Sequence, residues 1–233
     1  MNAAGAARLA LTAALLGLAP AAEAQVSGTV GVASDYRLRG FSLTDGRAVV
    51  TLGANYDHPS GLYAGGSVVA HDPSGHGVRL LGYQAYAGVA GRFGSGPSWD
   101  VGVSRVDMTP YFDRRYSIEY TQAYVGLSQG GLSGRLSLAE DYPRRNGATA
   151  YAELNGALRP ADRWRLTGHV GALKRLNGSP GRDDRTRYDV AVGVVREFRN
   201  SEAYLSWVAV SPRPPPKPSW TRPGLVAGVS AFF

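Results

Sequence analysis

The sequence predicts an all-β protein, namely a twelve-stranded antiparallel up-and-down transmembrane β-barrel. Three observations indicate this fold. Apolar and polar residues alternate over segments of strand length, the connections between those segments are alternately long and short, and the last segment ends in an aromatic residue, Phe233. The 233 residues include 31 glycines and 13 tyrosines, a composition typical of strands and tight turns rather than of helices.

The first residues are expected to form a secretory signal peptide. Arg8 supplies a positive charge, residues 9–18 form a short apolar run, and the tripeptide AEA at 22–24 resembles a cleavage site. A membrane anchor helix is disfavoured because the apolar run is too short to span a bilayer. The predicted organisation is therefore a signal peptide at 1–24 and one barrel at 25–233, exported to the outer membrane of a Gram-negative bacterium.

The alternation predicts the individual strands. Their expected ranges are 26–38, 47–57, 62–71, 79–93, 98–107, 116–128, 131–140, 148–158, 163–174, 186–198, 202–211 and 224–233. In the first strand, the apolar face holds Val26, Val30, Val32, Tyr36 and Leu38. The polar face holds Thr29, Asp35 and Arg37. An arginine in a strand would be costly in an apolar core, whereas a polar barrel lumen leaves it in contact with water or with an acidic neighbour.

The connections favour a membrane barrel over a soluble periplasmic β protein. A soluble sandwich also alternates, but only a membrane barrel requires tight turns at one end and longer loops at the other. The short connections are expected at 58–61, 94–98, 129–130, 159–162 and 199–201. The long ones are expected at 39–46, 72–78, 108–115, 141–147, 175–185 and 212–223. With an even number of strands, both chain ends fall on the periplasmic side.

The amino-terminal third also carries a recognisable pattern, S-D-Y-R-x-R-G, then an apolar strand, a Tyr-Asp pair and S-G-x-Y-A-G. The matching residues are Ser34, Asp35, Tyr36, Arg37, Arg39, Gly40, Tyr56, Asp57, Ser60, Gly61, Tyr63, Ala64 and Gly65. In this pattern, residues 26–72 resemble the TorF-type porin family of proteobacterial outer-membrane proteins. The resemblance implies an outer-membrane barrel but no particular substrate. The proline-rich loop at 211–223 is not part of the pattern.

Charged residues on the polar faces are the candidate lumen residues. They are Asp35, Arg37, Arg47, Asp57, Arg92, Asp100, Arg135, Glu153, Arg163, Arg165, His169, Arg187, Asp189, Glu197 and Glu202. Arginines and acids balance at seven each, so strong anion selectivity of the wall does not follow. Two interpretations stay open, a lumen cross-linked by ion pairs and a charge-lined path for solutes. Twelve strands predict a narrow path rather than a wide one.

The predicted function is that of an outer-membrane porin for passive diffusion of small solutes, with anionic solutes as one option. No enzymatic activity, catalytic residue, metal or other cofactor is expected, and the lack of cysteine excludes thiolate metal sites. One alternative is a non-conducting structural or adhesive barrel. Another is a membrane-embedded hydrolase that uses the loop from His71 to His76. Its polar residues crowd together without a scaffolded spacing, and the sequence holds no G-x-S-x-G or H-E-x-x-H motif.

The expected partners follow from this placement. They are outer-membrane lipid, lipopolysaccharide phosphates at the basic outer loops, the barrel-assembly machinery through the C-terminal strand with Phe233 as insertion signal, and small solutes. Nucleic acid is not expected for an exported barrel despite the net charge of +7. The oligomeric state is not predicted.

Overall fold

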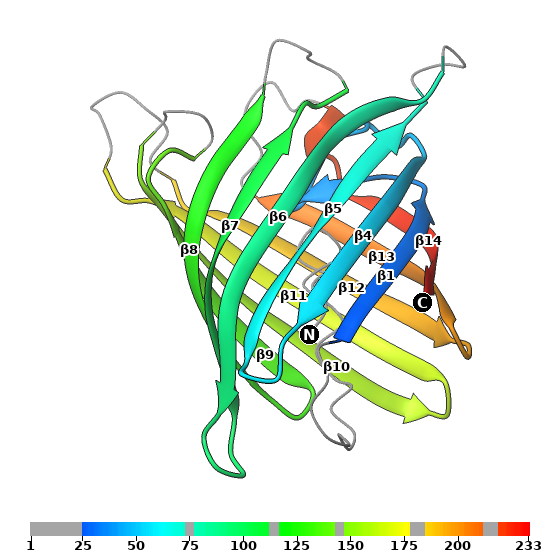
Figure 1. The fold of residues 1–233 in the computed structure, drawn as a ribbon. Coiled ribbons are helices and arrows are strands. Elements are labelled where there is room, and N and C mark those ends of the chain that lie inside the picture. The colour runs from blue at the N-terminus through cyan, green and yellow to red at the C-terminus, as the bar shows by residue number, and fades with distance from the viewer. Residues whose placement is uncertain (1–24, 73–76, 112–116, 143–146, 178–184, 212–218) are drawn as a thin grey trace.

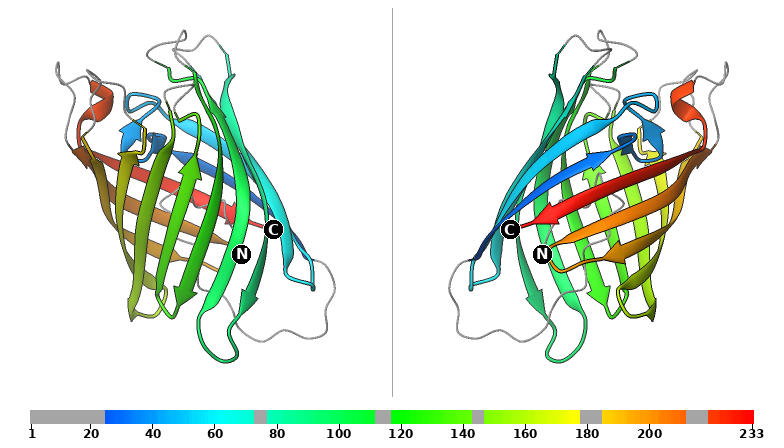
Figure 2. Two further views of the ribbon diagram at one scale, coloured as in Figure 1. Left: turned by 90° about the vertical axis from the view of Figure 1, so that its left-hand side faces the viewer. Right: turned by 90° about the vertical axis from the view of Figure 1, so that its right-hand side faces the viewer.

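The computed structural model is a closed antiparallel β-barrel (Figures 1 and 2). It describes residues 25–72, 77–111, 117–142, 147–177, 185–211 and 219–233. The barrel strands are β1 (Gln25–Ala33), β4 (Val49–Asp57), β5 (Leu62–His71), β6 (Arg79–Arg92), β7 (Ser98–Met108), β8 (Ile118–Gln129), β9 (Leu132–Ala139), β10 (Thr149–Ala161), β11 (Trp164–Arg175), β12 (Arg187–Glu197), β13 (Ser201–Ser211) and β14 (Gly224–Phe232). Each pairs with its neighbours along the chain, and β1 pairs with β14 to close the barrel. The predicted twelve-stranded antiparallel barrel is confirmed.

The connections differ in length between the two ends of the barrel, as expected. Short turns join β4 to β5, β6 to β7, β8 to β9, β10 to β11 and β12 to β13. They lie at the lower end in Figure 1, which we call the turn end, and the longer connections lie at the opposite, loop end. Strand β1 begins near the turn end and strand β14 ends near it. The two strands that pair to close the barrel therefore both run between the turn end and the loop end.

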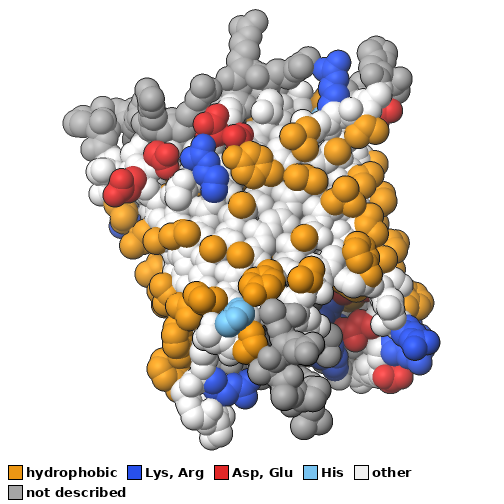
Figure 3. Space-filling model, in the orientation of Figure 1, with side chains coloured by type: hydrophobic (Ala, Val, Ile, Leu, Met, Phe, Trp, Pro, Cys, Tyr) orange, Lys and Arg blue, Asp and Glu red, His pale blue; other side chains and the backbone are white. Residues whose placement is uncertain are grey.

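The outer surface of the barrel is apolar around its whole circumference. Every barrel strand contributes at least one exposed large apolar side chain, and one from each, in chain order, is Val30, Leu52, Val68, Leu80, Val103, Val125, Leu136, Leu154, Val170, Val192, Leu205 and Val229. Figure 3 shows apolar side chains across the middle of one face and charged side chains toward its ends. Exposed aromatic side chains lie near both ends, for example Trp164 at the turn end and Trp207 at the loop end.

The interior changes character along the barrel axis. Toward the loop end it is filled by buried apolar side chains, among them Leu43, Leu81, Met108 and Tyr120. Elsewhere the inward positions are largely polar and include Thr51, Asn55, Gln84, Ser104, Ser137, Thr167 and Ser206. This distribution leaves a polar lumen below an apolar, packed region at the loop end.

The first strand departs from the expected range. It was predicted over 26–38, but β1 ends at Ala33 and the chain turns into the barrel. There it forms a two-stranded sheet of its own, β2 (Arg37–Leu38) with β3 (Phe41–Ser42), which we call the inward hairpin and define as residues 34–46. The prediction that Tyr36 and Leu38 face outward was therefore wrong. Both side chains are 5% exposed and belong to the apolar region inside the barrel.

Within the described ranges, no helix is long and apolar enough to cross a membrane. A short 3-10 turn, η2 (Ser219–Thr221), precedes β14 and contacts the inward hairpin, because the Trp220 ring lies 5.4 Å from that of Phe41.

Candidate functional site

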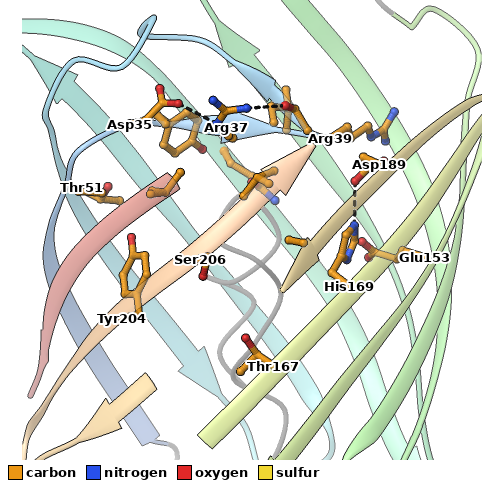
Figure 4. A pocket seen from close by; sticks show the side chains of 18 of the residues that line it. Asp35, Arg37, Arg39, Thr51, Glu153, Thr167, His169, Asp189, Tyr204 and Ser206 are labelled. Atoms are coloured by element: carbon orange, nitrogen blue, oxygen red, sulfur yellow. Dashed lines mark hydrogen bonds and ion pairs between the residues drawn. The ribbon is translucent and has the colours of Figure 1, made fainter. Parts of the chain in front are cut away.

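The candidate site is the cavity inside the barrel, beneath the inward hairpin. Its empty volume is about 1570 Å³, including the part that opens to solvent. Residues 35–40 of the hairpin line one part of it, and the walls come from strands around the barrel (Figure 4). The acids, arginines and histidine among the lining residues are Asp35, Arg37, Arg39, Arg135, Glu153, Arg165, His169, Asp189 and Glu202. The site therefore combines a polar wall with several charges of both signs.

The inward hairpin turns at Arg39 and Gly40. Their φ angles are 48° and 80°, so both central residues of the turn are left-handed, as in the type I′ turns that suit two-residue hairpins. A side chain at Gly40 would meet the wall, because a Cβ there would lie 2.8 Å from Cβ of Asp189 and 2.9 Å from Cβ of Val210. Glycine is thus required both by the turn and by the close approach of the hairpin tip to β12 and β13.

The carboxylate of Asp35 organises the hairpin. Its Oδ2 accepts a hydrogen bond from Arg37 Nε at 2.8 Å. Its Oδ1 accepts bonds from Ser42 Oγ at 2.6 Å and Thr44 Oγ1 at 2.7 Å, and a longer one from the Gly46 amide at 3.3 Å. Asp35 is 4% exposed, so this buried charge is stabilised entirely by the hairpin that it holds together.

An ion pair with tyrosine neighbours lies on the wall formed by β7 to β9. Arg135 Nη2 donates to Asp100 Oδ2 at 2.9 Å, and its guanidinium lies 4.3 Å from the Tyr124 ring centre. Tyr63 Oη donates to the same Asp100 oxygen at 3.2 Å and lies 2.7 Å from Tyr124 Oη. The charge of Arg135 is therefore paired and covered rather than free to attract an anion.

A second ion-pair group lies toward the turn end. Arg165 is 5% exposed and donates through Nη2 to Glu202 Oε2 at 2.8 Å, while its Nη1 lies 3.3 Å from Glu197 Oε1. Glu197 also accepts a bond from Arg159 Nη2 at 3.0 Å. Two arginines and two glutamates thus form a cross-link between β10, β11, β12 and β13.

His169 belongs to a hydrogen-bonded network on β10, β11 and β12. Its Nε2 lies 2.8 Å from Asp189 Oδ1, and its Nδ1 lies 2.6 Å from Asn155 Oδ1. Tyr151 Oη donates to Asp189 at 3.0 and 3.1 Å. Both ring nitrogens of His169 are engaged, so neither is free to act as a general base toward a nucleophile.

Glu153 differs from the other cavity-lining acids. Among the residues that the structure describes, no hydrogen-bond donor or cation pairs directly with its carboxylate. It lies near His169 and Asp189 on the same wall and is labelled in Figure 4. Because Asp35, Asp189 and Glu202 all have direct partners, Glu153 is the lining acid most available to a solute.

Some predicted lumen residues lie at the rims of the barrel instead of along the cavity. Arg47 is exposed at the loop end, where it lies 4.1 Å from the Tyr111 ring centre. Arg92 is exposed at the last residue of β6, and Arg163 occupies the turn between β10 and β11 with a side chain that is 63% exposed. Each stands at or beyond a strand end, where the alternation no longer fixes the direction of a side chain.

Three other predicted residues lie outside the lining of the cavity. Asp57 is half-buried at the last position of β4, and Glu197 belongs to the ion-pair group at the turn end. Arg187 is half-buried and lies 5.9 Å from the ring centre of Phe41, so it contacts the hairpin rather than solute space. Arg187 is therefore part of the barrel wall at the loop end, beside the inward hairpin.

The histidine loop gives no support for a hydrolase. His71 points inward, is 7% exposed and packs edge-on against Tyr111. The serine and the second histidine of the loop, Ser74 and His76, lie outside the described residues. Within the described part of the chain, no group of three or more histidines or acids is arranged to hold a metal ion.

Residues 18–210 match the sequence profile of a family described as bacterial protein of unknown function, Gcw_chp. The chain belongs to the Gcw_chp family. No curated protein matches it. Among solved structures, a KdgM porin has a TM-score of 0.54 at 14% identity, covering 89% of this chain and 99% of the porin. A KdgM porin in complex with disordered oligogalacturonate has a TM-score of 0.53 at 13% identity, covering 91% and 99%. The NanC porin has a TM-score of 0.54 at 9% identity, covering 89% and 99%. At these identities the likeness shows the fold of the Gcw_chp protein alone.

The position of Arg39 in this Gcw_chp protein was not predicted from the sequence. Arg39 was expected at the start of the long connection at 39–46, whereas its side chain lies inside the barrel among tyrosine rings. The signal was present in the sequence, because a two-residue Arg-Gly pair stands between the alternating segments Tyr36–Leu38 and Phe41–Leu43. Such a pair, with glycine second, indicates a tight hairpin.

Proposed function

We propose that this Gcw_chp protein is an outer-membrane porin that passes small polar solutes passively through its lumen. The observation that carries the proposal is the polar, charge-lined cavity enclosed by a barrel whose exterior is apolar on all twelve strands. This is the inverse of a soluble barrel, which presents polar residues to the solvent and fills its interior with apolar ones. The fold shared with KdgM and NanC porins and the TorF-type pattern of residues 26–72 support the same assignment.

The membrane placement rests on the outer surface. Closed barrels are the only sheets that satisfy every backbone group in lipid, and this barrel closes through the pairing of β1 with β14. Exposed aromatic side chains near both ends fit the two membrane interfaces. Export by residues 1–24 is part of the proposal, although those residues lie outside the described part of the chain.

The expected partners are assigned on the same basis. The last strand, which ends at Phe232 with Phe233 beside it, supplies one side of the closing seam and is the segment proposed to engage the barrel-assembly machinery. Exposed arginines at the loop end, such as Arg47, Arg79 and Arg222, suit the phosphates of lipopolysaccharide. Many other basic loop residues lie outside the described ranges.

The solutes are proposed to be small and polar. One KdgM porin structure contains disordered oligogalacturonate, an acidic oligosaccharide, but the lumen charges here offer less for such a ligand. Arg37, Arg135 and Arg165 are each paired with an acid, so the wall presents little unpaired positive charge. Passive transport also needs no enzymatic step, which agrees with the engaged ring nitrogens of His169.

The test is conductance of the purified, detergent-refolded protein in a planar bilayer under a salt gradient. We expect discrete steps of small amplitude and a measurable reversal potential, because the lumen is narrow and charged. Folding is verified by the heat-sensitive gel shift of the barrel, and the heat-unfolded preparation serves as the control. A silent bilayer from correctly folded protein would contradict the proposal.

A second candidate is a non-conducting structural barrel. The observation that favours it is the inward hairpin together with the ion pairs that cross-link the wall, because both narrow the lumen. The same bilayer experiment separates the two candidates.

A further inference from the structure

The inward hairpin crosses the loop end of the barrel and contacts both sides. Its tip at Gly40 lies against Asp189 and Val210, on β12 and β13. Arg37 Nη1 donates to the Arg222 carbonyl oxygen at 3.0 Å, next to the start of β14. On the other side, Arg39 reaches toward β8 and β10. The hairpin therefore bridges opposite walls where the interior is filled by apolar side chains.

Arg39 makes the contacts on that far side. Its guanidinium carbon lies 4.2 Å from the ring centre of Tyr151, 4.4 Å from that of Tyr142 and 5.1 Å from that of Tyr120. Its Nη2 donates to Gln122 Oε1 at 2.7 Å. The three rings are at most 5% exposed, so the cation–π contacts form away from water, where they are strongest. We call these three rings the tyrosine cage.

The backbone at Arg39 shows that this arrangement is specified by the fold. Its φ of 48° is uncommon for a residue other than glycine, asparagine or aspartate, and such a conformation persists when surrounding contacts determine it. The left-handed turn points the side chain across the lumen into the tyrosine cage. The left-handed backbone conformation of Arg39 costs free energy, and the contacts of its side chain with the tyrosine cage offset that cost.

The hairpin is separable from the barrel. Strands β2 and β3 pair with each other, and the barrel ladder is closed without them. Among the described residues, backbone hydrogen bonds between this segment and its surroundings are formed by Ser34 with Ala227 and by Leu43 with Tyr111. Movement of the hairpin tip would therefore break side-chain contacts and leave the twelve-stranded ladder intact.

We propose that the inward hairpin is a plug that closes the loop end of the lumen, and that Arg39, seated in the tyrosine cage, holds the plug closed. The role of the plug in controlling solute passage rests on the proposed channel function. The opening and closing of the hairpin does not, because the position of the plug can be measured without any current. Arg39 is a positioning residue that sets how often the passage is open.

The first readout is thiol labelling of a reporter on the plug. The chain has no cysteine, so Leu43→Cys introduces a single thiol. Leu43 is 1% exposed and lies in the apolar region, so the reporter should react slowly with a water-soluble maleimide while the plug is closed. Adding Arg39→Ala should raise the labelling rate by about tenfold or more, because three cation–π contacts and a hydrogen bond are lost. Arg39→Lys, which keeps the charge but not the planar fork, should give an intermediate rate.

The matched control is Arg163→Ala in the same reporter background. Arg163 is also an arginine with a left-handed φ, 59°, but it lies in an exposed turn at the opposite end of the barrel. This variant removes the same side chain from the same backbone conformation without touching the plug, and its labelling rate should equal that of the reporter alone.

Conductance of the same proteins separates the two proposals. Faster labelling with larger or more frequent current steps in Arg39→Ala supports both the plug and the channel. Faster labelling with silent bilayers for every variant supports the plug and contradicts the channel. An unchanged labelling rate in Arg39→Ala, with the barrel folded by gel shift, overturns the plug. If Arg39→Ala does not fold, the comparison of Arg39→Lys with the reporter alone decides in the same way.

Discussion

Replacing Asp35 by asparagine should loosen the inward hairpin while the barrel stays folded. The carboxylate of Asp35 accepts hydrogen bonds from Arg37, Ser42 and Thr44 within 2.8 Å, and asparagine has nearly the same shape. The substitution removes the negative charge and turns an NH₂ group toward one of these donors. The perturbation is therefore electrostatic rather than steric, and it is confined to the hairpin.

The expected magnitude follows from these contacts. A hydrogen bond to a charged group contributes about 1.5–3 kcal/mol, and an unpaired buried charge adds to the loss. Asparagine keeps one acceptor oxygen, and Arg37 retains its bonds to the Gly40 and Arg222 carbonyl oxygens. We therefore expect a net loss of about 3 kcal/mol, which corresponds to about a 150-fold increase in the open population of the hairpin.

Amide hydrogen exchange in detergent measures this population. The Leu43 amide, which donates to the Tyr36 carbonyl oxygen at 2.7 Å, should exchange about 150-fold faster in Asp35→Asn, where exchange follows the opening equilibrium. Amides of the ladder between β10 and β11 should be unchanged, because no ladder bond involves the hairpin.

A second aspartate in the same segment provides the control. Asp45 is exposed and has a φ of 54°, a conformation that asparagine tolerates, so Asp45→Asn should change exchange by less than about twofold. The reasoning is refuted if the Leu43 amide exchanges equally in Asp35→Asn and Asp45→Asn. It is equally refuted if the whole barrel exchanges faster in Asp35→Asn.

Three further predictions concern the lumen and the closing seam. Glu153→Gln should reduce the cation-to-anion permeability ratio about threefold, since one charge at roughly 6 Å in water contributes about 0.7 kcal/mol, and Asp162→Asn in an exposed turn should leave the ratio unchanged. Arg165→Glu should lower the free energy of unfolding by about 3–5 kcal/mol, because it puts a carboxylate beside the carboxylates with which the buried arginine pairs. Arg163→Glu should change the free energy of unfolding by less than about 0.5 kcal/mol. Urea unfolding followed by gel shift measures both, and equal midpoints would contradict the ion-pair interpretation. Phe233→Ala should reduce the yield of folded barrel in outer-membrane fractions, since the Phe233 ring covers Gly28 at the seam, and an unchanged yield would exclude it as an insertion signal.

The sequence alone determined the barrel strands, apart from the end of the first. Alternation is a local property, because successive side chains of a strand point to opposite faces wherever the strand lies. The observed bounds of β5 (Leu62–His71) coincide with the expected range, and those of β12 (Arg187–Glu197) lie within it. The apolar and polar faces of the strands do not determine the order of the strands in the sheet. The alternating lengths of the connections predicted the up-and-down order.

The candidate site was only partly predictable. The ion partners of Arg135 and Arg165 came from strands distant in sequence, so the residues could be named as lumen candidates but their pairing could not. Residues at strand ends, such as Arg47 and Arg163, were assigned to the lumen by a period that no longer applies there. The lone carboxylate of Glu153 is likewise a property of its neighbours and not of its own segment.

The inward hairpin was decided by the tertiary structure. Residues 34–38 continue the alternation of β1, with polar Asp35 and Arg37 alternating with apolar Tyr36 and Leu38, so the period fits a longer wall strand equally well. The Arg39-Gly40 pair indicates a turn, but the inward position of the hairpin depends on contact with distant residues, such as the bond from Arg39 to Gln122, 83 positions along the chain. The periodicity of a strand is determined by residues adjacent in the sequence. The position of the inward hairpin depends on the tyrosine cage, which forms only after the barrel has closed.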